Sequence, residues 1–181
     1  MGKFGVTKAY RFYADRYYLD RANRDVYLAR SSTGLTMPQD VELASGKNIA
    51  VLSALTSDHS WSGITATMTA GAALAIGNAC YVGGDSKLEK ALATGATTMP
   101  AIALVTATIA ENADGKVLLA GFFRDDTLSL TIGGMVYISK DTAGVLTSTA
   151  PSGAGQQVQA VGVAITAKII LWLPNLPMVE I

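Results

Sequence analysis

Three consecutive residues, Asp58, His59 and Ser60, have the side-chain types of a hydrolytic triad. A triad needs its carboxylate, imidazole and hydroxyl to converge from separate segments, whereas neighbouring residues of an extended chain point to opposite faces. We therefore interpret the tripeptide as a polar turn before Trp61. His59 is the single histidine of the chain and has no partner at a spacing typical of a general base, so the sequence predicts that the protein is not an enzyme.

Metal and cofactor chemistry has few candidate residues. One histidine and one cysteine, Cys80, cannot build the usual nitrogen and sulfur ligand sets, and we interpret Cys80 as a buried structural thiol. The acidic pair Asp125 and Asp126 lacks the oxygen-rich loop of a calcium site, and the adjacent Arg124 could neutralise it. The glycine-rich stretches lack the spacing of phosphate-binding loops. We therefore predict no metal site and no cofactor.

Residues 1–30 differ in chemistry from the rest of the chain. They carry seven basic and three acidic side chains, a net charge of +4, and seven of the thirteen aromatic residues, while the remainder has a net charge of −4. Arginine interleaved with tyrosine occurs in single-strand nucleic-acid sites and in protein interface hot spots. Three aspartates in the segment would repel phosphate, so we predict an arm that docks on another protein subunit and no direct nucleic-acid partner. Its best candidate contact residues are Tyr10, Arg11, Tyr13, Arg16, Tyr17 and Arg21.

The predicted secondary structure differs between the N-terminal segment and the rest of the chain. Apolar and aromatic residues over Tyr10–Asp25 recur at i, i+3, i+4 and i+7, which predicts a short amphipathic helix that could also pack on its own domain. An extended arm is the alternative. After Asp25, short runs typical of strands follow at Val26–Leu28, Val41–Leu43, Ile49–Leu55 and Ile64–Met68. Turn residues then recur every 8–12 positions or so, as in a sandwich or barrel.

An internal repeat is the most informative pattern. Ala75–Val82 is echoed 56 residues later by Thr131–Ile138, and the likeness extends over about 69–121 and 128–173. Two copies are too few for a solenoid. We therefore predict an N-terminal arm or short helix over residues 1–30 and an all-β domain over residues 31–181, a small antiparallel β-barrel or tulip-like sandwich with two related halves.

Composition narrows the function classes. Half of the 181 residues are hydrophobic, 15% are charged and the formal net charge is zero, which excludes a disordered chain and gives no electrostatic footprint for nucleic acid. No run of 18 apolar residues occurs, and the N-terminus lacks the apolar core of a signal peptide, so we expect no membrane partner. Few charges and many small apolar residues suit a surface covered by partner proteins.

Four stretches resemble virion proteins of tailed bacteriophages: Trp61–Gly71, Ala75–Val82, Gly121–Asp126 and Thr149–Ala164. Similar C-terminal β modules occur in capsid cement (decoration) proteins and in some head- or tail-fibre proteins. The resemblance implies a small β-barrel or tulip-like fold, usually trimeric, without catalytic residues. It also implies a protein made in the host bacterial cytoplasm and located on the outer surface of the capsid. There it would bind the major capsid protein and its own copies, bridging capsomers to stabilise the phage head. The alternative is a fibre or adhesin module that binds the particle or the host surface.

Overall fold

The computed structural model describes residues 17–19, 26–28 and 51–181. The chain divides into two compact units, Met1–Asn48 and Ile49–Ile181. In the first unit, β1 (Tyr17–Leu19) pairs antiparallel with β2 (Val26–Leu28). The predicted helix is therefore wrong at Tyr17–Leu19, where the extended alternative holds. Both segments carry tyrosine, and Val26 of the second is β-branched, and these residue types favour a paired strand. The predicted boundary after residue 30 and the run at residues 41–43 lie outside the described residues.

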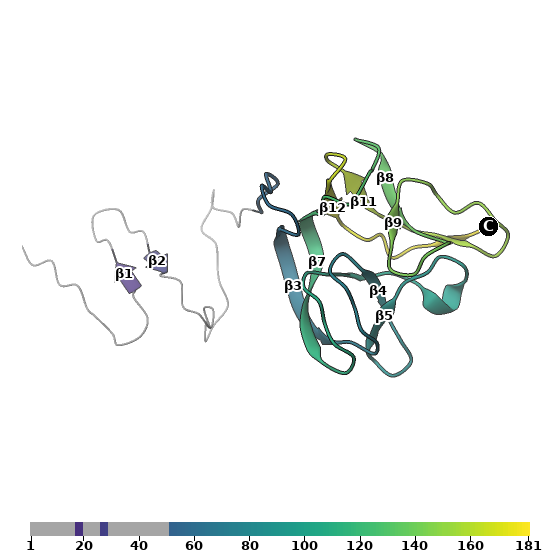
Figure 1. The fold of residues 1–181 in the computed structure, drawn as a ribbon, viewed down its shortest axis with the longest axis horizontal. Helices are drawn as coiled ribbons and strands as arrows, with labels where there is room; N and C mark the ends of the chain where they lie inside the picture. The colour runs from purple at the N-terminus through teal and green to yellow at the C-terminus, as the bar shows by residue number, and fades with distance from the viewer. Residues whose placement is uncertain (1–16, 20–25, 29–50) are drawn as a thin grey trace, which may run out of the picture. The chain divides into compact units, whose positions relative to one another are not determined.

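The second unit is built from strands, as predicted (Figure 1). Its sheet is antiparallel throughout the pairings between named strands and curls into a half-barrel. One short 3-10 helix, η1 (Ala96–Thr98), interrupts the strands. The strands are β3 (Trp61–Thr69), β4 (Ala79–Val82), β5 (Leu88–Lys90), β6 (Ala103–Val105), β7 (Asp114–Arg124), β8 (Met135–Ile138), β9 (Leu146–Thr147), β10 (Gln157–Val158), β11 (Ala160–Ala164), β12 (Ile169–Trp172) and β13 (Val179–Glu180).

The sequence repeat is also a repeat of strands and turns. β4 and β8 begin 56 residues apart, and β4 pairs with β5 and β6 as β8 pairs with β9 and β11. The turn before each strand carries a glycine with positive φ, Gly77 and Gly133. The Gly77 amide donates to the Val105 carbonyl at 2.9 Å, and the Gly133 amide donates to the Ala164 carbonyl at 2.8 Å. The two halves are therefore related in backbone geometry as well as in sequence.

Both halves join the sheet at one long strand, β7. β3 pairs with β7 from Trp61 to Thr69 along one edge. On the other edge, β7 pairs with β6 of the first half at Val117 and Leu118, and with β12 of the second half from Gly121 to Arg124. Figure 1 shows β3 and β7 side by side, with β4 and β5 on one side of the unit and β8, β11 and β12 on the other. The β3–β7 ribbon thus supports both halves.

The main core lies between the two halves. Its largest fully buried side chains include Phe123 of β7 and Trp172 of β12, and these pack with buried residues of both repeats. A second buried cluster, around Leu74, Cys80 and Val105, belongs to the first half alone. Cys80 is fully buried, which confirms the interpretation of a structural thiol.

The apolar run Ile49–Leu55 is not a strand over its described residues, 51–55. The Leu52 amide donates to the Ser62 hydroxyl at 2.9 Å, so it bonds to a side chain where a strand would bond to a neighbouring backbone. Leu55 is buried, and its carbonyl accepts a hydrogen bond from Arg124. Residues 51–54 are exposed, so within the described part of this run only Leu55 packs into the core.

Candidate functional site

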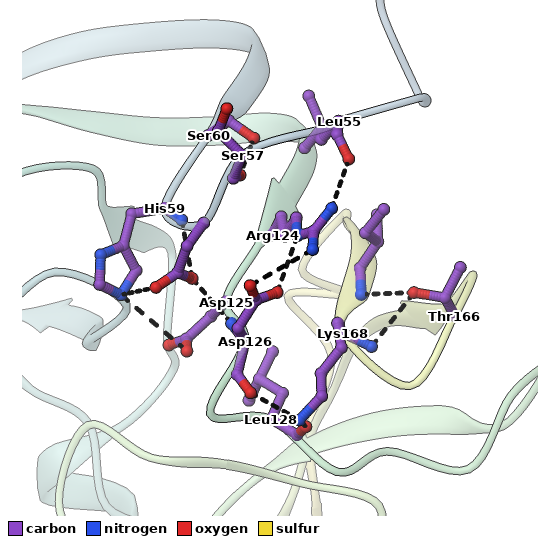
Figure 2. Close-up of polar contacts among 12 residues, drawn as sticks. Leu55, Ser57, His59, Ser60, Arg124, Asp125, Asp126, Leu128, Thr166 and Lys168 are labelled. Atoms are coloured by element: carbon purple, nitrogen blue, oxygen red, sulfur yellow. Dashed lines mark hydrogen bonds and ion pairs between the residues drawn. The ribbon is translucent and has the colours of Figure 1, made fainter.

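Two turns that are distant in sequence meet in a polar cluster (Figure 2). The first is a tight turn before β3, in which the Ser60 amide donates to the Ser57 carbonyl at 3.2 Å. His59 occupies this turn with φ of 56°, in the left-handed region that side chains rarely adopt. Its amide donates to Asp58 Oδ1 at 2.9 Å, and this bond steadies the conformation.

The second turn directly follows β7. Asp125 Oδ1 accepts hydrogen bonds from the amide and the hydroxyl of Thr127, at 2.8 and 2.5 Å. The Asp126 amide donates to Asp58 Oδ1 at 2.8 Å, which links this turn to the first across 68 residues of sequence. Antiparallel pairing of β3 with β7 brings the start of one strand beside the end of the other, and this register creates the meeting point.

Three potential ligand groups converge there. His59 Nε2 lies 3.7 Å from Asp58 Oδ2 and 4.0 Å from Asp125 Oδ1. One nitrogen and two carboxylate oxygens of Asp58, His59 and Asp125 all lie within 4.8 Å of one another. Asp125 is 9% exposed, and in Figure 2 its carboxylate points toward the imidazole. We name these three residues the Asp–His–Asp cluster.

The nearby cations are engaged by other groups. Arg124 forms a two-pronged pair with Asp126, with Nε 2.7 Å from Oδ1 and Nη2 3.3 Å from Oδ2. This hydrogen bonding lowers the pKa of the Asp126 carboxyl and raises the pKa of Arg124. Lys168 Nζ donates to the carbonyls of Asp126 and Leu128. Arg124 therefore neutralises one member of the predicted acidic pair, Asp126, and leaves Asp125 to face His59.

The structure does not arrange Asp58, His59 and Ser60 as a triad. The Ser60 hydroxyl donates to the Ser57 carbonyl at 2.5 Å and not to the imidazole. The polar-turn interpretation is confirmed by this geometry. Asp58–His59 and Asp125–Asp126 are far apart in the sequence, and the pairing of β3 with β7 brings the two motifs together.

A second candidate site is an apolar surface on the side of the sheet away from the main core. Direct register partners form a row across four strands, Met135 of β8, Val163 of β11, Leu171 of β12 and Phe122 of β7. Each of these is partly or largely exposed, and the residues that alternate with them along their strands are buried. Partners in register share one face of a sheet, so the four side chains form a continuous stripe.

Further exposed apolar residues flank this stripe. Ile64 of β3 pairs with Ala120, two residues before Phe122, and is 65% exposed. Leu173, directly after β12, is also exposed. At the other end, the bond from the Gly133 amide to the Ala164 carbonyl places exposed Ile132 and Ile165 beside the end of the stripe. We name the stripe together with these four residues the outer face.

Of the six candidate contact residues in the N-terminal arm, Tyr17 begins β1. Tyr10, Arg11, Tyr13, Arg16 and Arg21 lie outside the described residues. Among the described residues, none of the helices is long and apolar enough to cross a membrane. Comparison with protein-family models, curated proteins and solved structures found no match for this chain.

Proposed function

We propose that this protein is a structural component of a tailed-bacteriophage particle, a capsid cement protein that acts by contact and not by catalysis. In this role it binds the major capsid protein on the outer surface of the head, associates with its own copies as a trimer and bridges neighbouring capsomers. The observation that carries the proposal is the outer face, an apolar surface spanning β3, β7, β12, β11 and β8.

An apolar stripe of this kind suits a protein partner. Apolar side chains gathered on one face of a sheet are costly in water, and contiguous patches on soluble proteins commonly mark interaction surfaces. Removing apolar area from water contributes about 25 cal/mol per Å², so covering such a stripe favours association with a partner. Many copies on one shell then add their separate contacts through avidity.

The N-terminal arm supplies the second part of the proposed interface. Its net charge of +4 complements a shell or neighbouring subunit of negative charge, and its tyrosines and arginines are the residue types enriched in hot spots. Within the arm, Tyr10, Arg11, Tyr13, Arg16, Tyr17 and Arg21 are the proposed contacts. Deletion of residues 1–30 is expected to lower occupancy on empty mature capsids, measured by co-sedimentation. Unchanged occupancy would remove the arm from the proposal.

Substitution on the outer face tests its role directly. We expect the double variant Ile64→Thr/Met135→Gln to bind empty capsids at least tenfold more weakly than the natural chain, because it replaces two exposed apolar side chains of this face. The control is Val82→Thr, since Val82 is an exposed strand residue of β4 outside the face. Normal capsid binding by the double variant, with an unchanged melting temperature, would contradict the proposal.

Copy number separates a cement protein from the fibre alternative. A cement protein covers the shell, so its amount per particle should approach that of the major capsid protein in quantitative gel densitometry. A fibre module would occur in a few copies. A low copy number would replace the cement proposal with the fibre alternative.

A further inference from the structure

We propose that Asp58, His59 and Asp125 bind one divalent transition-metal ion, with Zn²⁺ as the best-fitting ion. The proposal concerns a site separate from the outer face and does not depend on the proposed virion function. It replaces the expectation, drawn from the sequence, that the chain holds no metal.

The first argument is charge. Asp125 is 9% exposed, and the two hydrogen bonds that its Oδ1 accepts from Thr127 come from neutral groups, so they do not neutralise the charge of the buried carboxylate. Arg124 is paired with Asp126, and Lys168 is bound to backbone carbonyls. Among the described residues, His59 Nε2 is the basic nitrogen that lies within 4.0 Å of Asp125. A divalent ion would balance the two carboxylates of Asp58 and Asp125, while imidazole binds metals through a neutral nitrogen.

The second argument is the ligand set and its geometry. Zn²⁺ binds imidazole nitrogen and carboxylate oxygen at about 2.0–2.2 Å, so two tetrahedral ligands lie about 3.3–3.6 Å apart. His59 Nε2 lies 3.7 Å from Asp58 Oδ2 and 4.0 Å from the nearer oxygen of the Asp125 carboxylate, and the three ligand atoms lie within 4.8 Å of one another, so shifts of about 1 Å would bring them to tetrahedral separations. Mg²⁺ and Ca²⁺ prefer ligand shells made of oxygen alone, so the imidazole favours a transition metal.

The third argument is orientation by the surrounding groups. Asp58 Oδ1 accepts the amides of His59 and Asp126, and this leaves Oδ2 facing the imidazole. The amide and hydroxyl of Thr127 donate to Asp125 Oδ1, which fixes the carboxylate plane and occupies the lone pairs of that oxygen, so Oδ2 of the same carboxylate is the oxygen left to bind the ion. Hydrogen bonds of this kind orient metal ligands and lower the entropy lost on binding. Three protein ligands leave a fourth position for water or for a ligand from a partner. The bound ion would tie the turn before β3 to the turn after β7.

The single histidine makes the test specific. The full-length chain, without an affinity tag and after treatment with a chelator, is titrated with ZnCl₂ by calorimetry and, in parallel, by NMR of the one imidazole ring. We expect one ion per chain, a saturable shift of the His59 resonances and a rise in melting temperature. MgCl₂ at the same concentrations should give none of the three.

Variants assign the ligands. His59→Gln and Asp125→Asn are each expected to weaken Zn²⁺ binding at least tenfold, whereas Asp141→Asn, at an exposed carboxylate that pairs with Lys140, should leave it unchanged. Circular dichroism checks that each variant is folded. If Asp125→Asn does not fold, the Zn²⁺ affinity of His59→Gln alone tests the proposal. Absence of saturable binding to the natural chain, or equal binding by folded His59→Gln, would overturn the proposal.

Discussion

At the scale of single residues, Cys80 links burial to the pH dependence of stability. Burial raises the pKa of its thiol from 9.0 to about 12, with a smaller lowering by Lys90. Between these values the folded chain keeps a proton that the unfolded chain releases, so the free energy of unfolding should decrease as pH rises, by about 1.4 kcal/mol per pH unit. Urea denaturation at pH 8.5, 9.5 and 10.5 measures the slope. Cys80→Ala should flatten it, and an equal slope in that variant would contradict the assignment.

The candidate ligands show how far single residues can be interpreted from sequence. Asp58–His59 and Asp125–Asp126 were both recognisable as polar motifs, because one holds the single histidine of the chain and the other holds two adjacent carboxylates. Their convergence could not be predicted, since it depends on the register in which Trp61 pairs with Phe123. The adjacent Arg124 was correctly predicted to neutralise the acidic pair. The sequence does not show that Arg124 forms its ion pair with Asp126 and not with Asp125.

At the scale of elements, Gly63 and Gly121 allow β3 and β7 to approach closely. They are register partners, and a Cβ atom on Gly121 would overlap the Ser62 carbonyl, while a Cβ on Gly63 would overlap the Ala120 carbonyl. Gly121 also has φ of 144°, which disfavours a side chain. We expect Gly121→Ala to cost about 2–3 kcal/mol or more in unfolding free energy. Gly84→Ala, where nothing lies within 4 Å of the added Cβ, is the control and should be nearly neutral. Equal stability of both variants would contradict the close approach.

Strands could be predicted from the sequence where apolar and polar residues alternate regularly. Ile64–Met68 alternates with period two and lies inside β3. Ile49–Leu55 has comparable hydrophobicity, yet its described part forms a loop, because its Leu52 amide bonds to a side chain. Tyr17–Leu19 has helical spacing of its aromatic residues but forms a strand paired with Val26–Leu28. In the first failure an apolar run found no partner strand, and in the second, pairing between segments outweighed a local helical pattern.

At the scale of the whole molecule, Gln159 joins the two halves. It is 1% exposed, its Oε1 accepts the Ala101 amide at 2.8 Å and its Nε2 donates to the carbonyls of Ala101 and Asn175. Gln159→Leu leaves buried backbone groups without partners, so we expect a loss of about 2–3 kcal/mol in a single cooperative transition. Urea denaturation followed by tryptophan fluorescence measures it. Glu111→Gln, at an exposed side chain, is the control. Two separate transitions in the natural chain would show that the halves are not coupled.

The division into two related halves was visible in the sequence, because Ala75–Val82 and Thr131–Ile138 keep the same glycine and aromatic positions. Their arrangement was not visible. Both halves attach to one edge of β7 through long-range pairing with β6 and β12. A sequence repeat does not show which strand its two copies will pair with.

This shared edge also imposes an order in time during synthesis. Residue Ile169 leaves the ribosome 45 positions after its partner Arg124. At translation rates of roughly 5–20 residues per second, the end of β7 waits about 2–9 seconds for β12. Throughout that interval it presents unpaired amides and carbonyls beside an apolar face, which is a template for pairing with another nascent chain. Slower elongation lengthens the exposure. Aggregation during expression should therefore increase when translation across residues 125–172 is slowed.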